Sequence, residues 1–92
     1  MPLTGRVTFK AMLKKRDLLY VPKLIRWQYK LEPSEVLKVT VSVVGEMGVR
    51  ESFLGKIHKD GRIVIPKLQI ALLRRNQPSL EGFALEVTIE PT

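Results

Sequence analysis

The chain contains an internal repeat, and this repeat limits the folds that it can adopt. Pro22 and Pro66 lie 44 positions apart, and residues 6–26 align with residues 50–70 at that offset without a gap. The identical pairs are Arg6 with Arg50, Phe9 with Phe53, Lys15 with Lys59, Lys23 with Lys67 and Leu24 with Leu68. Because a fixed period indicates a repeated structural unit, we predict a single domain over residues 1–92 with internal repeats at about 5–45 and 49–92.

Each copy begins with a segment in which apolar residues occupy every second position. Such alternation is typical of a strand with one buried face. The positions predicted to be buried are Val7, Phe9, Ala11 and Leu13 in the first copy and Phe53, Gly55 and Ile57 in the second. Polar residues follow at 14–17 and 58–61, so we expect a turn at both places and a β-hairpin at the start of each copy.

A turn, a short strand and the start of a helix are compressed into residues 60–68, and again into residues 17–24. The second copy has Gly61 in the turn, and glycine accepts the positive φ angle that tight hairpin turns require. A β-branched run suited to a strand follows it. Pro22 and Pro66 then have the fixed φ angle and the missing N–H that suit the first position of a helix.

Two helices and two closing strands complete the copies. The residues expected on the buried faces of the helices are Leu24, Ile25, Trp27, Tyr29 and Leu31, and then Leu68, Ala71 and Leu72. Residues 37–42 and 85–90 alternate almost identically and predict the closing strands. We therefore predict an all-β fold, a small closed six-stranded barrel with an internal pseudo-twofold duplication and two short helices.

Composition excludes several classes of protein. The chain has no cysteine, so a disulfide framework and a thiolate metal site are both impossible. Its apolar runs are much shorter than a bilayer span, and its N-terminus lacks the apolar region of a signal peptide. We therefore expect a cytoplasmic protein with no membrane partner.

Residues that carry out catalysis are scarce in this sequence. His58 is the single histidine and falls in a predicted turn, so we interpret it as a solvated turn residue and not as a metal ligand. Residues 45–48 contain two glycines but lack the spacing of a phosphate-binding fingerprint. We predict no catalytic activity, no metal and no cofactor; a flavin- or nucleotide-related activity is the alternative.

The formal net charge of +7 favours a polyanionic partner such as DNA. The candidate contacts are basic residues of the predicted turns and helices: Lys14, Lys15, Arg16, Lys23, Arg26, Lys59, Arg62 and Lys67. Tyr20, Trp27 and Tyr29 have side chains that stack on bases in other proteins, but a helix aromatic with apolar neighbours is more often part of the core. The competing interpretation of the charge is a solvated surface that keeps a small protein soluble.

Residues 61–68, Gly-Arg-Ile-Val-Ile-Pro-Lys-Leu, resemble the core signature of the AbrB-type swapped-hairpin transcription factors. The repeated unit also resembles the wider cradle-loop barrel group, which includes the double-psi and RIFT barrels. AbrB-type proteins have one unit per chain and interleave two chains into a DNA-binding dimer. Because this chain has both units, the resemblance implies a RIFT-type barrel completed by one chain, as in the archaeal riboflavin kinases, and an archaeal source.

Most of the arginines that the resemblance implies for DNA contact are absent. AbrB-type proteins place them before the turn, after the turn glycine and as a pair on the helix. Arg62 keeps the position after the turn, and Arg26 keeps one position of the helix pair. The other positions hold Ala11, Leu18, Trp27, Gly55, Ile70 and Ala71. We therefore expect weak phosphate contacts with little sequence preference.

Three classes of function stay open on the sequence alone. The first is a nucleic-acid-binding barrel of AbrB-like ancestry, the second a RIFT-type barrel that binds a small ligand or nucleotide, and the third a non-catalytic protein-interaction module. Retention on heparin or DNA that weakens with salt favours the first. A thermal shift with flavins or nucleotides favours the second, because a ligand of the folded state raises stability.

We predict that the protein is a monomer. Two linked units bury against each other the surface that a single unit must bury against a second chain. Sedimentation at micromolar protein concentration measures the mass directly, and an obligate dimer would contradict this prediction.

Overall fold

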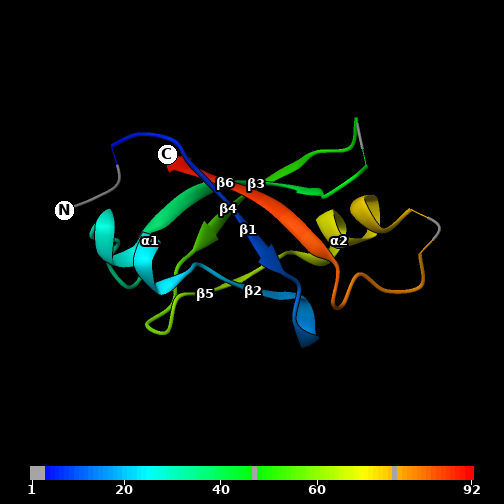
Figure 1. Ribbon diagram of the computed structural model, residues 1–92, viewed down its shortest axis with the longest axis horizontal. Coiled ribbons are helices and arrows are strands. Elements are labelled where there is room, and N and C mark those ends of the chain that lie inside the picture. The colour runs from blue at the N-terminus through cyan, green and yellow to red at the C-terminus, as the bar shows by residue number, and fades with distance from the viewer. Residues whose placement is uncertain (1–3, 47, 76) are drawn as a thin grey trace.

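Six strands and two α-helices occur within residues 4–46, 48–75 and 77–92, the part of the chain that the computed structural model describes (Figure 1). They follow one another as β1 (Val7–Met12), β2 (Leu18–Tyr20), α1 (Lys23–Gln28), β3 (Val36–Val43), β4 (Glu51–Lys56), β5 (Arg62–Val64), α2 (Lys67–Arg74) and β6 (Ala84–Pro91). A 3-10 turn, η1 (Lys15–Asp17), separates β1 from β2. The predicted order of strand, strand, helix, strand is confirmed in both halves.

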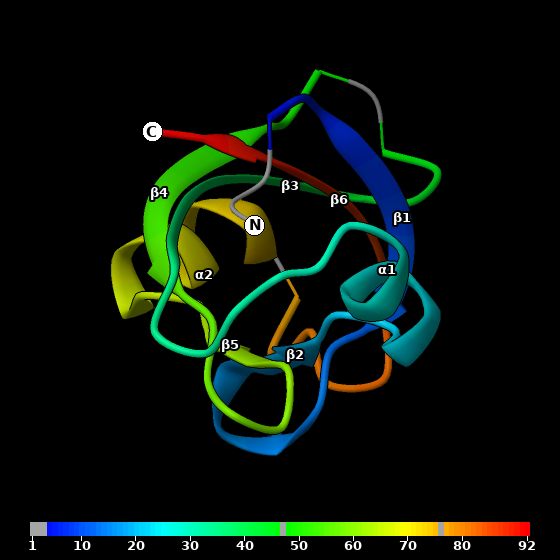
Figure 2. The same cartoon turned by 90° about the vertical axis from the view of Figure 1, so that its left-hand side faces the viewer.

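The strands form two open sheets, so the predicted closed barrel is wrong. One sheet has the order β1-β6-β3-β4, and the other, called here the β2–β5 ribbon, pairs the two short strands. Figure 2 shows the larger sheet arching over the ribbon. Where β1 approaches β2, the pairing is reduced to an isolated bridge between Lys14 and Leu18. The short strands end just before Pro22 and Pro66, which have no N–H to extend a ladder, so the sheets do not join.

The hairpins predicted within each copy are replaced by strand pairs between the copies. β1 pairs with β6, from Val7 opposite Ile89 to Met12 opposite Ala84, and β4 pairs with β3 in the same way. A six-residue strand satisfies more backbone hydrogen bonds along an eight-residue strand than along a strand of three residues. The longer ladder therefore decides the partner of β1.

Equivalent positions of the two copies meet at the centre of each sheet. In the β2–β5 ribbon, Leu19 lies opposite Ile63, the residue that aligns with it at the 44-residue offset. In the larger sheet, Thr40 lies opposite Thr88, its counterpart in the second closing strand. Because each of these pairs joins equivalent residues on antiparallel strands, one approximate twofold axis passes through both sheets.

The core lies between the two sheets and is made mainly of alternate strand residues. Val7, Phe9 and Leu13 are buried and Ala11 is half-buried, as the alternation predicts. Among the described residues, no polar or charged side chain is buried. The radius of gyration is 12.4 Å, close to the value of about 12 Å expected for a compact domain of this length. The buried hydrophobic residues are Val7, Phe9, Leu13, Leu19, Val21, Leu37, Val39, Val41, Val43, Ile57, Ile63, Ile65, Ile70, Leu73, Leu80, Leu85, Val87 and Ile89.

The buried faces predicted for the helices are largely wrong. α1 has no fully buried residue; Leu24 and Trp27 are 72% and 76% exposed, whereas Ile25 and Leu31 pack partly against the core. The other predicted residues, Tyr29, Leu68, Ala71 and Leu72, are exposed, and α2 instead buries Ile70 and Leu73. Helices of six and eight residues complete about two turns, which is too few for hydrophobic periodicity to define a face. In the described part of the chain, no helix has the length and apolar character needed to cross a membrane.

The two prolines precede the helices by one residue instead of starting them. Pro22 and Pro66 have ψ angles of 142° and 148°, so their backbone is still extended and the helices begin at Lys23 and Lys67. Each proline thus fixes the corner between a short strand and its helix.

We expect Pro66→Gly to lower the free energy of unfolding by about 1 kcal/mol, because glycine loosens this corner and enlarges the unfolded ensemble. Urea denaturation measures the change. Pro78→Gly in the exposed loop after α2 is the control for the unfolded-state effect alone, and it should lower stability less. A Pro66→Gly variant as stable as the wild type would contradict this view of the corner.

Candidate nucleic-acid interface

The turn between β4 and β5 is built around Gly61. Its φ angle is 87°, which confirms the predicted need for glycine. The Gly61 amide donates to the carbonyl oxygen of His58 at 2.9 Å. The Arg62 amide donates to Oδ1 of Asp60 at 3.3 Å. The side chains of Lys59 and Arg62 therefore project from a tight, well-bonded turn.

The equivalent turn of the first copy reaches a similar shape without glycine. Arg16 and Asp17 have φ angles of 64° and 59°, in the left-handed region that side chains other than glycine seldom adopt. The Lys14 amide donates to the carbonyl oxygen of Leu18 at 2.7 Å and closes the turn. Lys14, Lys15 and Arg16 are all exposed. Three consecutive cations are thus held on one tight turn.

Each turn adjoins the helix of the other copy. The Val21 amide, just before α1, donates to the carbonyl oxygen of Gly61 at 2.9 Å. The Ile65 amide, just before α2, donates to the carbonyl oxygen of Asp17 at 3.0 Å. The predicted contact residues therefore divide into two groups, one at each end of the β2–β5 ribbon. The α1 end contains Lys23, Arg26, Lys59 and Arg62, and the α2 end contains Lys14, Lys15, Arg16 and Lys67.

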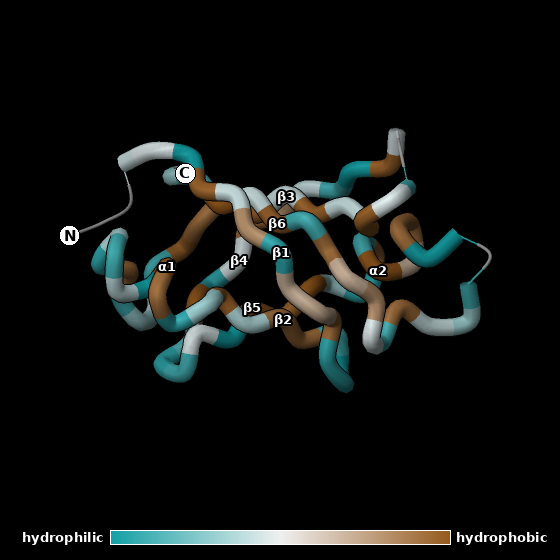
Figure 3. The backbone as a smooth tube through the Cα atoms, viewed as in Figure 1, coloured by the Kyte–Doolittle hydropathy of each residue, from teal (hydrophilic) through white to brown (hydrophobic). Residues whose placement is uncertain are grey.

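Both ends lie on the same side of the molecule. Figure 1 shows the turn after β4 and the turn after β1 at the two ends of the β2–β5 ribbon, along its lower edge. Figure 3 shows hydrophilic residues in both turns. The ribbon strands have three residues each, a length of about 10 Å, and most of the cations lie beyond them in the turns and helices.

Arg26 is the most firmly held of these cations. It is half-buried, and its Nε donates to the carbonyl oxygen of Val21 at 3.2 Å. Its side chain also lies across the turn of the second copy, because a Cβ added at Gly61 would be 2.5 Å from Arg26 Nε. The missing side chain of Gly61 thus makes room for Arg26.

Most of the other cations have no carboxylate partner in the described ranges. Arg62 is the exception, with its Nε 3.8 Å from Oδ1 of Asp60. The six that form no such ion pair are Lys14, Lys15, Arg16, Lys23, Lys59 and Lys67. All six are exposed, so their charge is available to a ligand.

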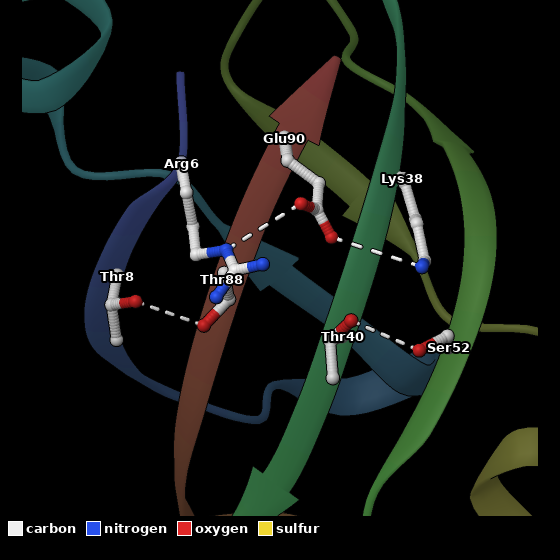
Figure 4. A network of polar contacts seen from close by, with 7 residues as sticks. All are labelled: Arg6, Thr8, Lys38, Thr40, Ser52, Thr88 and Glu90. Carbon is white, nitrogen blue, oxygen red and sulfur yellow. Dashed lines mark hydrogen bonds and ion pairs between the residues drawn. The ribbon is translucent and has the colours of Figure 1, made fainter. Parts of the chain in front are cut away.

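The outer face of the larger sheet carries charges that are compensated (Figure 4). Glu90 accepts ion pairs from Arg6 at 3.5 Å and from Lys38 at 3.8 Å, and Lys10 lies opposite Glu86. Between these charges the Oγ1 atoms of Thr8 and Thr88 are 2.9 Å apart, and Thr40 and Ser52 form an equivalent hydroxyl pair at 2.9 Å. Among the described residues, thirteen lysines and arginines form no ion pair. Seven of them lie at the ends of the β2–β5 ribbon, and the others are Lys10, Lys30, Arg50, Lys56, Arg74 and Arg75.

Trp27 is a surface residue that the sequence pattern assigned to the core. It lies on α1 beside Lys23 and Arg26, with 76% of its surface exposed. Tyr20 is 39% exposed and lies opposite Arg62 in the ribbon. One signal was present in the repeat, since Trp27 aligns with Ala71, whereas core positions such as Leu19 and Ile63 are large and apolar in both copies.

Other candidate sites are less developed. A hollow of about 290 Å³ lies beside the connector between the copies, where Lys10 and Arg50 are accompanied by Glu46 and Glu86; Met47 of that connector is outside the described residues. His58 is half-buried in its turn and its amide donates to the carbonyl oxygen of Arg62 at 2.9 Å. In residues 4–46, 48–75 and 77–92, no three His, Asp or Glu side chains are grouped so that they could hold a metal ion.

Comparison with known proteins identifies a structural likeness. The solution structure of PHS018 from Pyrococcus horikoshii matches this chain with a TM-score of 0.73 and 17% sequence identity, over 99% of this chain and 94% of that one. No family model and no curated protein sequence matches the chain. At this level of identity the likeness shows that the chain shares its fold with this archaeal protein. It shows nothing about activity.

We expect Gly61→Ala to destabilise the protein more than Gly82→Ala, by about 1 kcal/mol, the net contribution of one hydrogen bond. Both glycines have positive φ angles, 87° and 84°, so both variants include the backbone strain of alanine in the left-handed region. At Gly82 the surrounding space is open, so the added Cβ meets no other atom. Gly61→Ala in addition pushes Arg26 away and removes its hydrogen bond to Val21. Urea denaturation of both variants measures the difference, and equal losses would show that Arg26 is not held across the turn.

Proposed function

We propose that this protein, as a cytoplasmic monomer, binds nucleic acid weakly and with little sequence preference through phosphate contacts. The observation that carries the proposal is the concentration of eight basic side chains at the two ends of the β2–β5 ribbon. Seven of them form no ion pair with a carboxylate of the described chain, and six of these seven are exposed. Neutralised phosphates release counterions, so such a surface favours any polyanionic backbone.

The types of residue favour phosphate contact over base readout. Five of the eight cations are lysines, which act as mobile point charges and lack the planar fork with which arginine reads guanine. Of the three arginines, Arg26 is tied to the backbone and Arg62 is paired with Asp60. Arg16 is the arginine of this set that is exposed. The two ends of the ribbon therefore have too few available arginines to form a set of bidentate contacts with bases.

We include in the proposal an AbrB-like ancestry within the cradle-loop barrels, which the resemblance of residues 61–68 supports.

The combined substitution Lys14→Gln, Lys15→Gln and Arg16→Gln should lower affinity for unrelated duplexes about equally. It should also reduce the slope of log affinity against log salt by roughly one unit per lost phosphate contact. Fluorescence anisotropy of labelled duplexes, from about 50 mM to 200 mM salt, measures both quantities.

A matched control changes the net charge equally on the compensated face. Arg6→Gln, Lys10→Gln and Lys38→Gln together should leave affinity and salt slope nearly unchanged, because these side chains face Glu90 and Glu86. Lys59→Gln with Arg62→Gln should act in the same direction as the first variant but less, since Arg62 is already paired with Asp60. Equal losses in the two triple variants would mean that overall charge, and not the ribbon ends, binds the duplex.

A further inference from the structure

The exposed indole of Trp27 distinguishes the α1 end from the rest of the surface. Large aromatic side chains are usually well covered in folded proteins, yet Trp27 is 76% exposed on a helix with no fully buried residue. Leu24, one turn away on the same helix, is 72% exposed. Trp27 therefore contributes little to the packing of the core, and its indole is accessible to a ligand.

The surroundings of Trp27 are cationic and hollowed. A hollow of about 400 Å³ is lined, among the described residues, by Lys23, Arg26 and Trp27. This volume is within the range of about 300–1,000 Å³ typical of small-molecule sites. Two positive charges and one aromatic face are the chemistry that receives a base together with its phosphate.

One wall of this hollow is held in place before any ligand arrives. Arg26 donates from Nε to the carbonyl oxygen of Val21 at 3.2 Å and lies across Gly61. Figure 1 shows α1 above the turn between β4 and β5, and Figure 2, which faces the α1 side, shows the helix above this turn and to its right. The hydrogen bond of Arg26 therefore fixes one cation at the edge of the hollow that Trp27 also lines.

The α2 end has the charges but not the aromatic face. Ala71 occupies the position equivalent to Trp27, and Leu18 with Val64 occupies the ribbon positions equivalent to Arg62 with Tyr20. The two ends are therefore similar as phosphate sites and different as base sites. Phosphate binding alone would not require an aromatic side chain at one end of the ribbon and not at the other.

We propose that the α1 end stacks an unpaired base on Trp27, so that the preferred ligand is single-stranded nucleic acid. This inference rests on the proposed phosphate binding and adds the form of the ligand. In a duplex the faces of the bases are covered by their neighbours, whereas a single strand presents them to an aromatic side chain. Stacking of this kind tolerates any base, which agrees with the lack of arginine pairs for sequence readout.

The intrinsic fluorescence of the protein tests this directly, because Trp27 is its single tryptophan. Oligothymidine of about 12 nucleotides should quench the emission to saturation, and a duplex of the same length should bind with little quenching. Affinity for the single strand should be about 10-fold higher than for the duplex, the ratio that one stacked base provides. Binding of oligothymidine without a change in emission would overturn the proposal.

Variants separate stacking from charge. Trp27→Ala should lower affinity for oligothymidine about 10-fold and leave duplex affinity and the salt slope unchanged, whereas Trp27→Phe should keep much of the affinity. Leu68→Ala, which truncates another exposed apolar residue, on α2, is the control and should change neither affinity. Anisotropy of labelled oligonucleotides measures these affinities, and circular dichroism verifies that each variant is folded.

The outcomes also separate this inference from the proposed function. Duplex binding that depends on Lys14, Lys15 and Arg16, with single-strand binding unaffected by Trp27→Ala, would keep phosphate binding and reject stacking. No binding of either form at about 50 mM salt would reject both. If polyglutamate quenched the Trp27 emission as strongly as oligothymidine does, the α1 end would be a binding site for an acidic protein segment. That result would overturn the proposal.

Discussion

The antiparallel pairing of β2 with β5 is the constraint on which the rest of this structure depends. These strands have three residues each, yet they join the two copies at an approximate twofold axis through Leu19 and Ile63. The pairing is extended by the two hydrogen bonds in which residues before the helices donate to the turns of the other copy. Since a proline follows immediately, the same contacts fix where both helices start and which turn each helix meets.

The basic surface follows from this exchange between copies. Within one copy, the cations of the turn and those of the helix lie at opposite ends of the ribbon; the other copy supplies the neighbour for each. The two copies then differ where their sequences differ. Gly61 allows Arg26 to lie across one turn, whereas Asp17 and Ile70 occupy the equivalent places at the other end. A duplicated scaffold thus presents two ends of similar charge and different chemistry.

Much of the fold could be predicted because strand alternation is a local property. The burial of Val7 and Phe9, the closing strands and the positive φ angle of Gly61 each depend on a few neighbouring residues. Two predictions failed because they needed non-local information. The predicted hairpins assumed that neighbours in sequence pair in space, but the long closing strands compete more effectively for β1 and β4. The prediction that Trp27 is buried was wrong because a short helix does not define its own buried face.

By itself, the sequence determined the repeated order of elements, the apolar strand faces and the number and kind of basic residues. These follow from periodicity, turn chemistry and composition, all of which are local or additive. Only the tertiary structure decided that the sheets stay open, that Glu90 compensates Arg6 and Lys38, and that Trp27 stands in solvent beside Arg26. The reason is that pairing between distant segments depends on which backbone groups and side chains meet in space, and no short window of sequence contains both partners.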